Sequence, residues 1–205
     1  MNLTCHRGAK HEYRETEQGV DLFSVSQIRR MAHDPYIGIP EQVLEAARHR
    51  GTLLHRRFWR LLASQAGLMP VPQAIPQFSG YCASMDEWVK RNQVMPVKIE
   101  EASCSLKYGY AGTPDAFITI GSKQFKALID LKTGAPNKTD PMQLIAYSKM
   151  DGYEEADYLV DVYVQEDGSR AKEARITPGM KATEWCWFMS ALGNLQSRVN
   201  HGCSS

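Results

Sequence analysis

The chain has 205 residues, 43% of them hydrophobic and 23% charged, with a formal net charge of +1 at pH 7. This length and composition are typical of a globular protein with a core of its own. The near-zero net charge excludes a positive field over the whole surface, so a field that attracts nucleic acid must be local. No apolar run is as long as a membrane span, and no signal peptide is visible. We therefore expect a cytoplasmic protein with no membrane partner.

The cysteines indicate a reducing compartment. Their number is odd and no C-x-x-C pair occurs, which favours free thiols over a disulfide framework. They are Cys5, Cys82, Cys104, Cys186 and Cys203.

The chain is expected to form a single domain, residues 1–205, with loosely ordered ends at residues 1–20 and 200–205. Order is expected to begin near Ser24 or Ser26, either of which can cap a short helix.

A long helix is predicted from Pro40 onward, because apolar residues recur there every three to four positions. His55 lies at the edge of this apolar stripe. Two interpretations are open, a packed core histidine and a metal ligand, and the carboxylates further along the chain favour the ligand.

The same region carries the local positive charge. From Ala46 to Ser84 there is no Asp or Glu, and the segment contains five arginines. A run of one sign is either a solvated face or a phosphate-contacting surface, and its position beside His55 favours phosphate contact. Arg56 and Arg57 directly follow His55 and are the candidates for this phosphate contact.

The middle of the chain is predicted to contain a loop, a helix and a strand. Residues 69–77 are proline-rich and are expected to be a spacer or a wall of a substrate channel. Ser84-x-x-Glu87 fits a capping box that opens a short helix. Residues 97–108 are expected to form one strand that carries Glu100 and Glu101, of which only one can face a site.

Two apolar strands follow, the first after Asp115 and the second ending at Asp130-Leu131-Lys132. Alternation in a strand places Asp130 and Lys132 on one face and Leu131 on the other. Buried charges cost free energy unless they have partners, and the partner that suits two aspartates is a divalent cation, Mg²⁺ or Mn²⁺. The carbonyl oxygen of Leu131 is a further candidate ligand.

The helix after these strands is expected to begin with Asp140 at its N-cap and Pro141 at its first position. Gln143 and Tyr147 are four residues apart and therefore share a helix face, and Tyr147 could equally be a core residue. A hairpin and a final amphipathic helix complete an α/β fold with a mixed central sheet flanked by helices.

Four short motifs resemble a known family. They occur in this order: Gly51-x-x-x-His55, Gly112-x-x-Asp115, Asp130-Leu131-Lys132-Thr133-Gly134 and Gln143-x-x-x-Tyr147. The ordered set, over residues 51–147, resembles the PD-(D/E)xK nuclease superfamily, and within it the RecB-type and phage-exonuclease branch. That resemblance implies a restriction-endonuclease-like core.

The resemblance also implies roles for particular residues. An acid upstream of the G-x-x-D motif is expected at the site, and Glu100 fits better than Glu101, although two exposed edge carboxylates remain an alternative. The implied catalytic residues are Asp115, Asp130, Lys132, Glu100 and Gln143. The implied metal ligands are His55, Asp115, Asp130 and the carbonyl of Leu131. The implied DNA contacts are Arg56, Arg57 and Tyr147.

The implied activity is that of a Mg²⁺-dependent DNA exonuclease of recombination or repair, with a phage origin, and hence a bacterial host cytoplasm, left open. The alternatives are a structure-specific or site-specific endonuclease on the same fold and a DNA-binding module that no longer cuts. DNA is the expected partner, and a single-strand annealing protein or recombinase and an oligomeric state are left open. Only Cys186 and Cys203 lie late in the chain, without close spacing, so no iron–sulfur cluster is expected.

Overall fold

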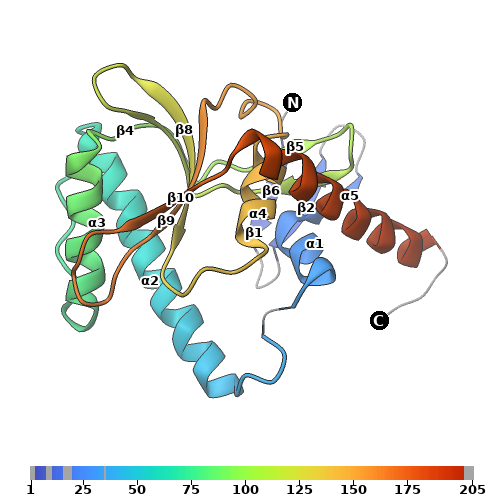
Figure 1. Cartoon of the computed structure of the whole chain (residues 1–205), viewed down its shortest axis with the longest axis horizontal. Helices are drawn as coiled ribbons and strands as arrows, with labels where there is room; N and C mark the ends of the chain where they lie inside the picture. Colours follow the sequence, from blue (N-terminus) through green and yellow to red (C-terminus); the bar gives the residue numbers. More distant parts are fainter. Residues whose placement is uncertain (1–2, 8–10, 16–19, 35, 201–205) are drawn as a thin grey trace.

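The computed structural model describes residues 3–7, 11–15, 20–34 and 36–200. It contains two five-stranded sheets with helices packed against them (Figure 1). Both sheets are mixed, because each has one parallel pair of strands among antiparallel ones. The predicted α/β class, with a mixed central sheet flanked by helices, is confirmed, and the second sheet is an addition that the sequence pattern does not indicate.

The central sheet has the strand order β10-β9-β8-β7-β4. Its strands are β4 (Met95–Ile99), β7 (Ala116–Ile120), β8 (Phe125–Lys132), β9 (Tyr158–Tyr163) and β10 (Lys172–Arg175). The strand β8 lies in the middle, parallel to β9 and antiparallel to β7. The residue that precedes β7 therefore lies beside the end of β8, which brings two distant acidic positions of the sequence together.

The second sheet has the order β1-β2-β3-β6-β5. Its strands are β1 (Leu3–Arg7), β2 (His11–Glu15), β3 (Asp21–Ser24), β5 (Ser103–Ser105) and β6 (Tyr110–Gly112). The first two strands correct the prediction of loose order at the N-terminus; the rest of residues 1–19 lies outside the described residues, as do residues 201–205. These strands are polar, so no apolar alternation marks them.

The single strand predicted over residues 97–108 is wrong, because the chain forms β4 and β5 instead. Glu100 interrupts it with φ 49°, a left-handed backbone conformation that cannot continue a strand. The chain thereby leaves the central sheet after β4 and enters the second sheet at β5.

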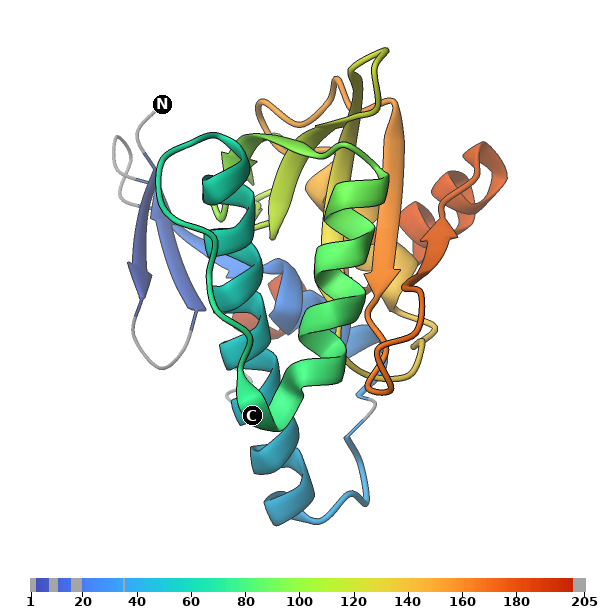
Figure 2. The same cartoon turned by 90° about the vertical axis from the view of Figure 1, so that its left-hand side faces the viewer.

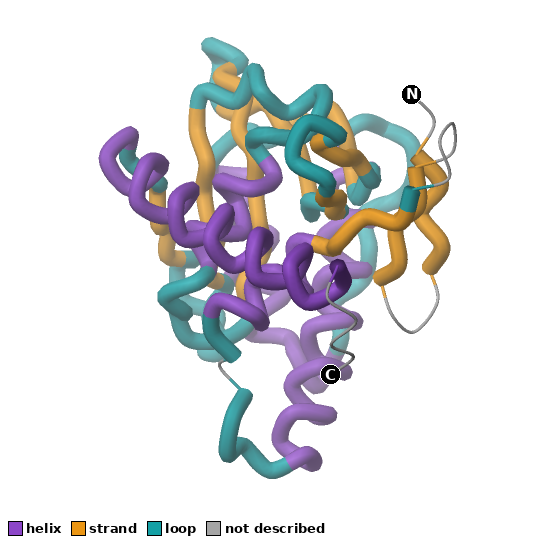
Figure 3. Tube along the Cα trace, turned by 90° about the vertical axis from the view of Figure 1, so that its right-hand side faces the viewer, coloured by secondary structure: helices purple, strands orange, loops and turns teal. Residues whose placement is uncertain are grey.

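Helices cover both faces of the central sheet. The helices α2 (Glu41–Gln65) and α3 (Ser79–Arg91) lie side by side on one face (Figure 2). The helices α1 (Val25–Ala32), α4 (Asp140–Tyr147) and α5 (Pro178–Asn200) lie on the other, which α5 crosses (Figure 3). Alternate residues of β8 enter two separate apolar clusters, Ile129 and Leu131 with α2 and α3, and Leu128 with α1, α4 and α5.

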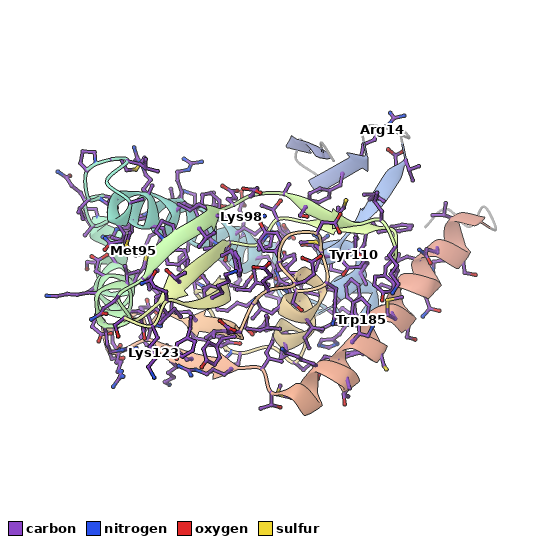
Figure 4. The ribbon with its side chains drawn as sticks, turned by 90° about the horizontal axis from the view of Figure 1, so that it is seen from above. Arg14, Met95, Lys98, Tyr110, Lys123 and Trp185 are labelled. Carbon is purple, nitrogen blue, oxygen red and sulfur yellow. The ribbon has the colours of Figure 1, made fainter. Side chains whose placement is uncertain are left out.

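Among the aromatic residues of α5, Phe188 is buried in the core, and Trp185 and Trp187 are partly buried against it. Trp185 lies with its ring centroid 6.4 Å from that of Tyr110, and Phe188 lies 4.9 Å from Tyr110 (Figure 4). Tyr110 belongs to β6, so these contacts join the last helix to the second sheet.

Capping explains where two of the helices begin. Ser24 caps α1 in a reciprocal box: the N–H of Gln27 donates to Ser24 Oγ at 3.1 Å, and the N–H of Ser24 donates to Gln27 Oε1 at 2.8 Å. The capping box predicted at Ser84 is wrong, because α3 already begins at Ser79 after a 3₁₀ turn (Pro76–Phe78). Ser84 is buried inside that helix, and its hydroxyl accepts the N–H of Gln165.

The cysteines within the described part of the chain whose side chains are placed are free: Cys82 and Cys104 are buried, and Cys186 is exposed. Cys203 lies outside the described residues. Within the described ranges, no helix combines the length and the apolar character that crossing a membrane requires.

Candidate active site

The end of β8 delivers two charged side chains to one face of the central sheet. Asp130 is buried and Lys132 is partly buried, and Lys132 Nζ lies 2.5 Å from Asp130 Oδ2. Leu131, between them, points into the apolar cluster under α2 and α3. The predicted alternation along β8 is therefore what the structure shows.

The ammonium group of Lys132 is surrounded by oxygen atoms from three elements. Besides Asp130, it lies 2.9 Å from Gln143 Oε1 and 3.3 Å from Asp140 Oδ1, both on α4, and 3.7 Å from Asp161 Oδ1 on β9. Burial lowers the pKa of Lys132, but the carboxylates of Asp130, Asp161 and Asp140 outweigh it and raise the pKa above its ordinary value. Lys132 therefore stays charged at every physiological pH.

Asp115 joins the site from the residue before β7. Its Oδ2 accepts the N–H of Leu131 at 2.7 Å, and its Oδ1 lies 2.9 Å from His55 Nδ1. Burial lowers the pKa of His55, and the charges of Asp115 and Asp130 more than compensate, so its pKa is raised. His55, which α2 brings from far away in the sequence, is thus paired with a carboxylate.

The carbonyl oxygen of Leu131 faces the same side as Asp115. Within an extended residue the N–H and the C=O point to the same side, and the N–H of Leu131 points to Asp115. The next residue is turned the other way, because the carbonyl of Lys132 accepts the N–H of Val164 at 3.0 Å. The proposed ligand carbonyl is therefore on the side where the carboxylates lie.

Helix α4 supplies a polar edge to the site, and its start differs from the prediction. Thr139, not Asp140, is the N-cap residue. Asp140 instead turns its carboxylate toward the site, where Oδ2 accepts the N–H of Asn137 at 2.9 Å and the hydroxyl of Tyr163 at 2.8 Å. A side chain that already binds Lys132 and Tyr163 is not available for capping.

Arg29 on α1 is a site residue that the sequence reading missed. Its guanidinium donates to Gln143 Oε1, to Thr139 Oγ1 at 3.2 Å, and to Asp140 Oδ1 at 3.4 Å. Arg29 follows the buried Val25 by four residues. That spacing, which puts a basic side chain on the inward face of a short helix, is the signal that could have found it.

Tyr147 does not lie where a DNA contact was predicted. Tyr147 is 4% exposed, and its hydroxyl oxygen accepts a hydrogen bond from Gln143 Nε2 at 3.0 Å. Its ring lies so close to β6 that a Cβ at Gly112 would meet Tyr147 Cε1 at 2.5 Å, which explains why that position is glycine. The structure corrects the prediction, because Tyr147 packs inside the protein and supports Gln143 there.

The main chain of Glu100 is hydrogen-bonded to a site residue, because its N–H donates to the carbonyl oxygen of Asp115 at 3.1 Å. Its neighbour Glu101 is exposed and pairs with Lys98 at 3.3 Å. Of the two acids, Glu100 is thus the one whose main chain is tied to a site residue.

The two arginines predicted to hold phosphates differ in their surroundings. Arg56 is exposed, whereas Arg57 is 4% exposed and binds both oxygens of Asp86, at 2.7 and 2.8 Å. Arg57 also donates to the carbonyls of Pro72 and Gln73 in the proline-rich loop. This burial contradicts a phosphate-binding role for Arg57, which instead ties α2 to α3 and to that loop.

The donor types at the site fit a divalent cation. Two carboxylates, an imidazole and a main-chain carbonyl are ligands that Mg²⁺ or Mn²⁺ accepts. In the part of the chain that the structure describes, no three or more His, Cys, Asp and Glu side chains are already arranged around one metal position. The carboxylates are not arranged around one position because they already have other partners. Asp115 Oδ1 is hydrogen-bonded to His55, and Asp130 Oδ2 is paired with the Lys132 ammonium. Cation binding therefore requires at least one of these contacts to open.

No family model and no curated protein matches the chain. Among solved structures, it is similar to an alkaline exonuclease (LHK-Exo) from Laribacter hongkongensis, with a TM-score of 0.45 and 12% identity over 88% of this chain and 90% of the other. The same exonuclease in complex with dAMP gives a TM-score of 0.40 over the same shares of the two chains. The protein SSO0001 gives a TM-score of 0.43 and 18% identity over 83% of this chain and 74% of the other.

The contrast between neighbouring arginines gives a test of the corrected assignment. Arg57→Ala should lower the free energy of unfolding by roughly 2–4 kcal/mol, because it removes a buried guanidinium and its hydrogen bonds to a charged partner. Arg56→Ala, one residue away and exposed, is the matched control and should change it by less than about 0.5 kcal/mol. Urea unfolding measures both, and equal losses would show that Arg57 does not anchor the loop.

Proposed function

We propose that this protein hydrolyses DNA phosphodiester bonds with the help of a divalent cation bound at the end of the central sheet. The observation that supports this most strongly is the juxtaposition of three side chains: Asp130 and Lys132 at the end of β8, and Asp115 just before the adjacent strand β7. Two buried carboxylates beside a permanently charged lysine combine the groups that hold a cation with a group that stabilises negative charge. The four motifs that resemble the PD-(D/E)xK superfamily place the same residues in the same roles.

The charge balance of the site supports a cation. Three carboxyl groups, those of Asp130, Asp140 and Asp161, lie 2.5, 3.3 and 3.7 Å from the Lys132 ammonium, and Asp140 also pairs with Arg29. A fourth, that of Asp115, pairs with His55 and lies close enough to Asp130 to raise the pKa of that residue. Burial and the neighbouring carboxylates raise the pKa of Asp130 above its ordinary value and that of Asp161 to about 8. A carboxyl group with a raised pKa is in surroundings that are too negative or too dry for its charge. A divalent cation relieves this excess.

His55, Asp115, Asp130 and the Leu131 carbonyl would hold the cation, which when bound makes a water molecule more acidic and stabilises charge on the phosphoryl oxygens. The residues of the chain do the rest. Lys132 keeps its proton and faces the developing negative charge. Gln143 and Arg29 hold Lys132 and the start of α4 in place. Glu100 is proposed as an additional acid at the site's edge.

The finer proposal is an exonuclease acting in recombination or repair, on the strength of the motif resemblance. A structure-specific or site-specific endonuclease would use the same residues, and a module that binds DNA without cutting would leave Lys132 and the acids unused. A phage origin, a single-strand annealing protein or recombinase as partner, and the choice between Mg²⁺ and Mn²⁺ belong to this finer proposal.

A cleavage assay on linear and covalently closed circular DNA tests the function. With Mg²⁺ the wild-type protein should degrade linear DNA and spare the circle, and a chelator should stop it. Asp130→Asn should lose at least about a hundredfold in rate, because it removes a charge from the site but almost no volume.

Asp151→Asn, an exposed aspartate in the loop after α4, is the control and should cut like the wild type. Cutting of the circle would replace the exonuclease with the endonuclease. Binding without any cutting, or an Asp130→Asn protein as fast as the wild type, would overturn the proposal.

DNA phosphates are proposed to contact the exposed arginines of α2. Arg56 and Arg60 are exposed and line a groove of about 590 Å³ between this helix and the proline-rich loop. No acidic residue lines the groove, and Arg56 directly follows His55. A groove with two exposed guanidinium groups, and with no carboxylate among the described residues that line it, suits a phosphate backbone.

Replacing both Arg56 and Arg60 with Ala should weaken DNA binding for all sequences alike and reduce the slope of log affinity against log salt by up to ~2. The charge-matched control replaces Arg170 and Arg198, two exposed arginines on other elements, and should keep the slope. Titrations of labelled DNA at several salt concentrations measure it. If both double variants behave alike, the groove is ordinary surface.

A further inference from the structure

One buried carboxyl group of the site has no hydrogen-bonding partner in the described protein. Asp161 lies in the middle of β9, and its side chain is 0% exposed. Neither of its carboxyl oxygens accepts a hydrogen bond from any residue that the structure describes. Its nearest opposite charge is the ammonium of Lys132, 3.7 Å from Oδ1, which is too far for a hydrogen bond.

The fold itself does not require an aspartate there. The neighbours of Asp161 along β9, Val160 and Val162, are buried on the opposite face, and Leu159, on its own face, belongs to the apolar cluster of α1, α4 and α5. An apolar side chain at this position would extend that cluster. A buried carboxyl group without hydrogen bonds costs folding free energy that an apolar residue would not cost.

What Asp161 does contact is the group proposed to stabilise negative charge. It is the direct partner of Asp130 across the parallel β8–β9 pair, so the two carboxyl groups lie on adjacent strands and both face Lys132. The Lys132 side chain is long and has rotatable bonds, and its ammonium lies only 2.5 Å from Asp130. With Asp130 and Asp140 alone, nothing on the β9 side would keep the ammonium from moving further onto those two carboxylates.

We propose that Asp161 is a positioning residue, whose carboxyl oxygen holds the Lys132 ammonium from the β9 side and keeps it aimed at the substrate phosphate. Asp161 touches neither substrate nor cation in this account and acts through Lys132. Functional residues often lower the stability of the fold while they raise activity, and a buried carboxyl group without hydrogen bonds fits that pattern. This inference rests on the proposed hydrolysis of DNA.

Two substitutions at Asp161 separate this role from a structural one. Asp161→Val replaces the carboxyl group with an apolar side chain suited to a strand, and Asp161→Asn keeps an oxygen at nearly the same place. For Asp161→Val we expect kcat on linear DNA to fall at least tenfold, KM to stay within about twofold, and the melting temperature to stay equal or rise. Asp161→Asn should keep clearly more of kcat than Asp161→Val.

The results decide whether Asp161 has a positioning role or a structural one. If Asp161→Val lowers the melting temperature by several degrees along with kcat, Asp161 is a structural residue and the inference is wrong. If kcat stays within about twofold of the wild type, or if Asp161→Asn and Asp161→Val lose the same factor, the inference is also wrong. A wild-type protein that does not cut DNA refutes the proposed function instead, and that outcome is read from the wild type alone.

Discussion

A lysine ammonium among three buried carboxylates is the interaction on which this end of the molecule depends. The Lys132 side chain is largely shielded from water, at 13% exposure, and an ammonium without partners there would be neutral or would destabilise the strand end. Asp130 on the same strand, Asp161 on the neighbouring strand and Asp140 on α4 keep it charged. Each of these acids is in turn buried and depends on the same lysine.

This mutual dependence explains the positions of the surrounding elements. The parallel pairing of β8 with β9 sets Asp130 beside Asp161. The start of α4 must bring Asp140 and Gln143 to the ammonium, and Arg29 on α1 ties that start in place. The site is therefore built from a strand end, a neighbouring strand and two helices that pack on one face of the sheet, with α2 contributing His55 from the other side.

The sequence was sufficient for those features that local periodicity determines. Strand alternation predicts that Asp130 and Lys132 share a face, and Ser24 was among the expected caps. It was insufficient where a side chain's role depends on a distant partner. Arg56 and Arg57 look equivalent in the sequence, and only the position of Asp86 on α3 decides which of them is buried.

The same limit applies to the other corrections. The sequence left Tyr147 open as a DNA contact or a core residue, and the close approach of β6 at Gly112 encloses it. Asp161 reads as one polar residue in an apolar strand, and only the register with β8 shows that it faces Lys132. The strand β2 pairs with β3, and β1 pairs with β2, and no local sequence pattern reveals either pairing.

The central claim is that the acids at the end of β8 and beside β7 form a cation site. Calorimetric titration of Mg²⁺ or Mn²⁺ into the wild-type protein and into Asp115→Asn, without DNA, tests this most directly. We expect saturable binding to the wild type that weakens at least about tenfold in the variant, because Asp115 is a proposed ligand and the partner of His55. No binding to the wild type, or the same affinity in both proteins, would contradict it.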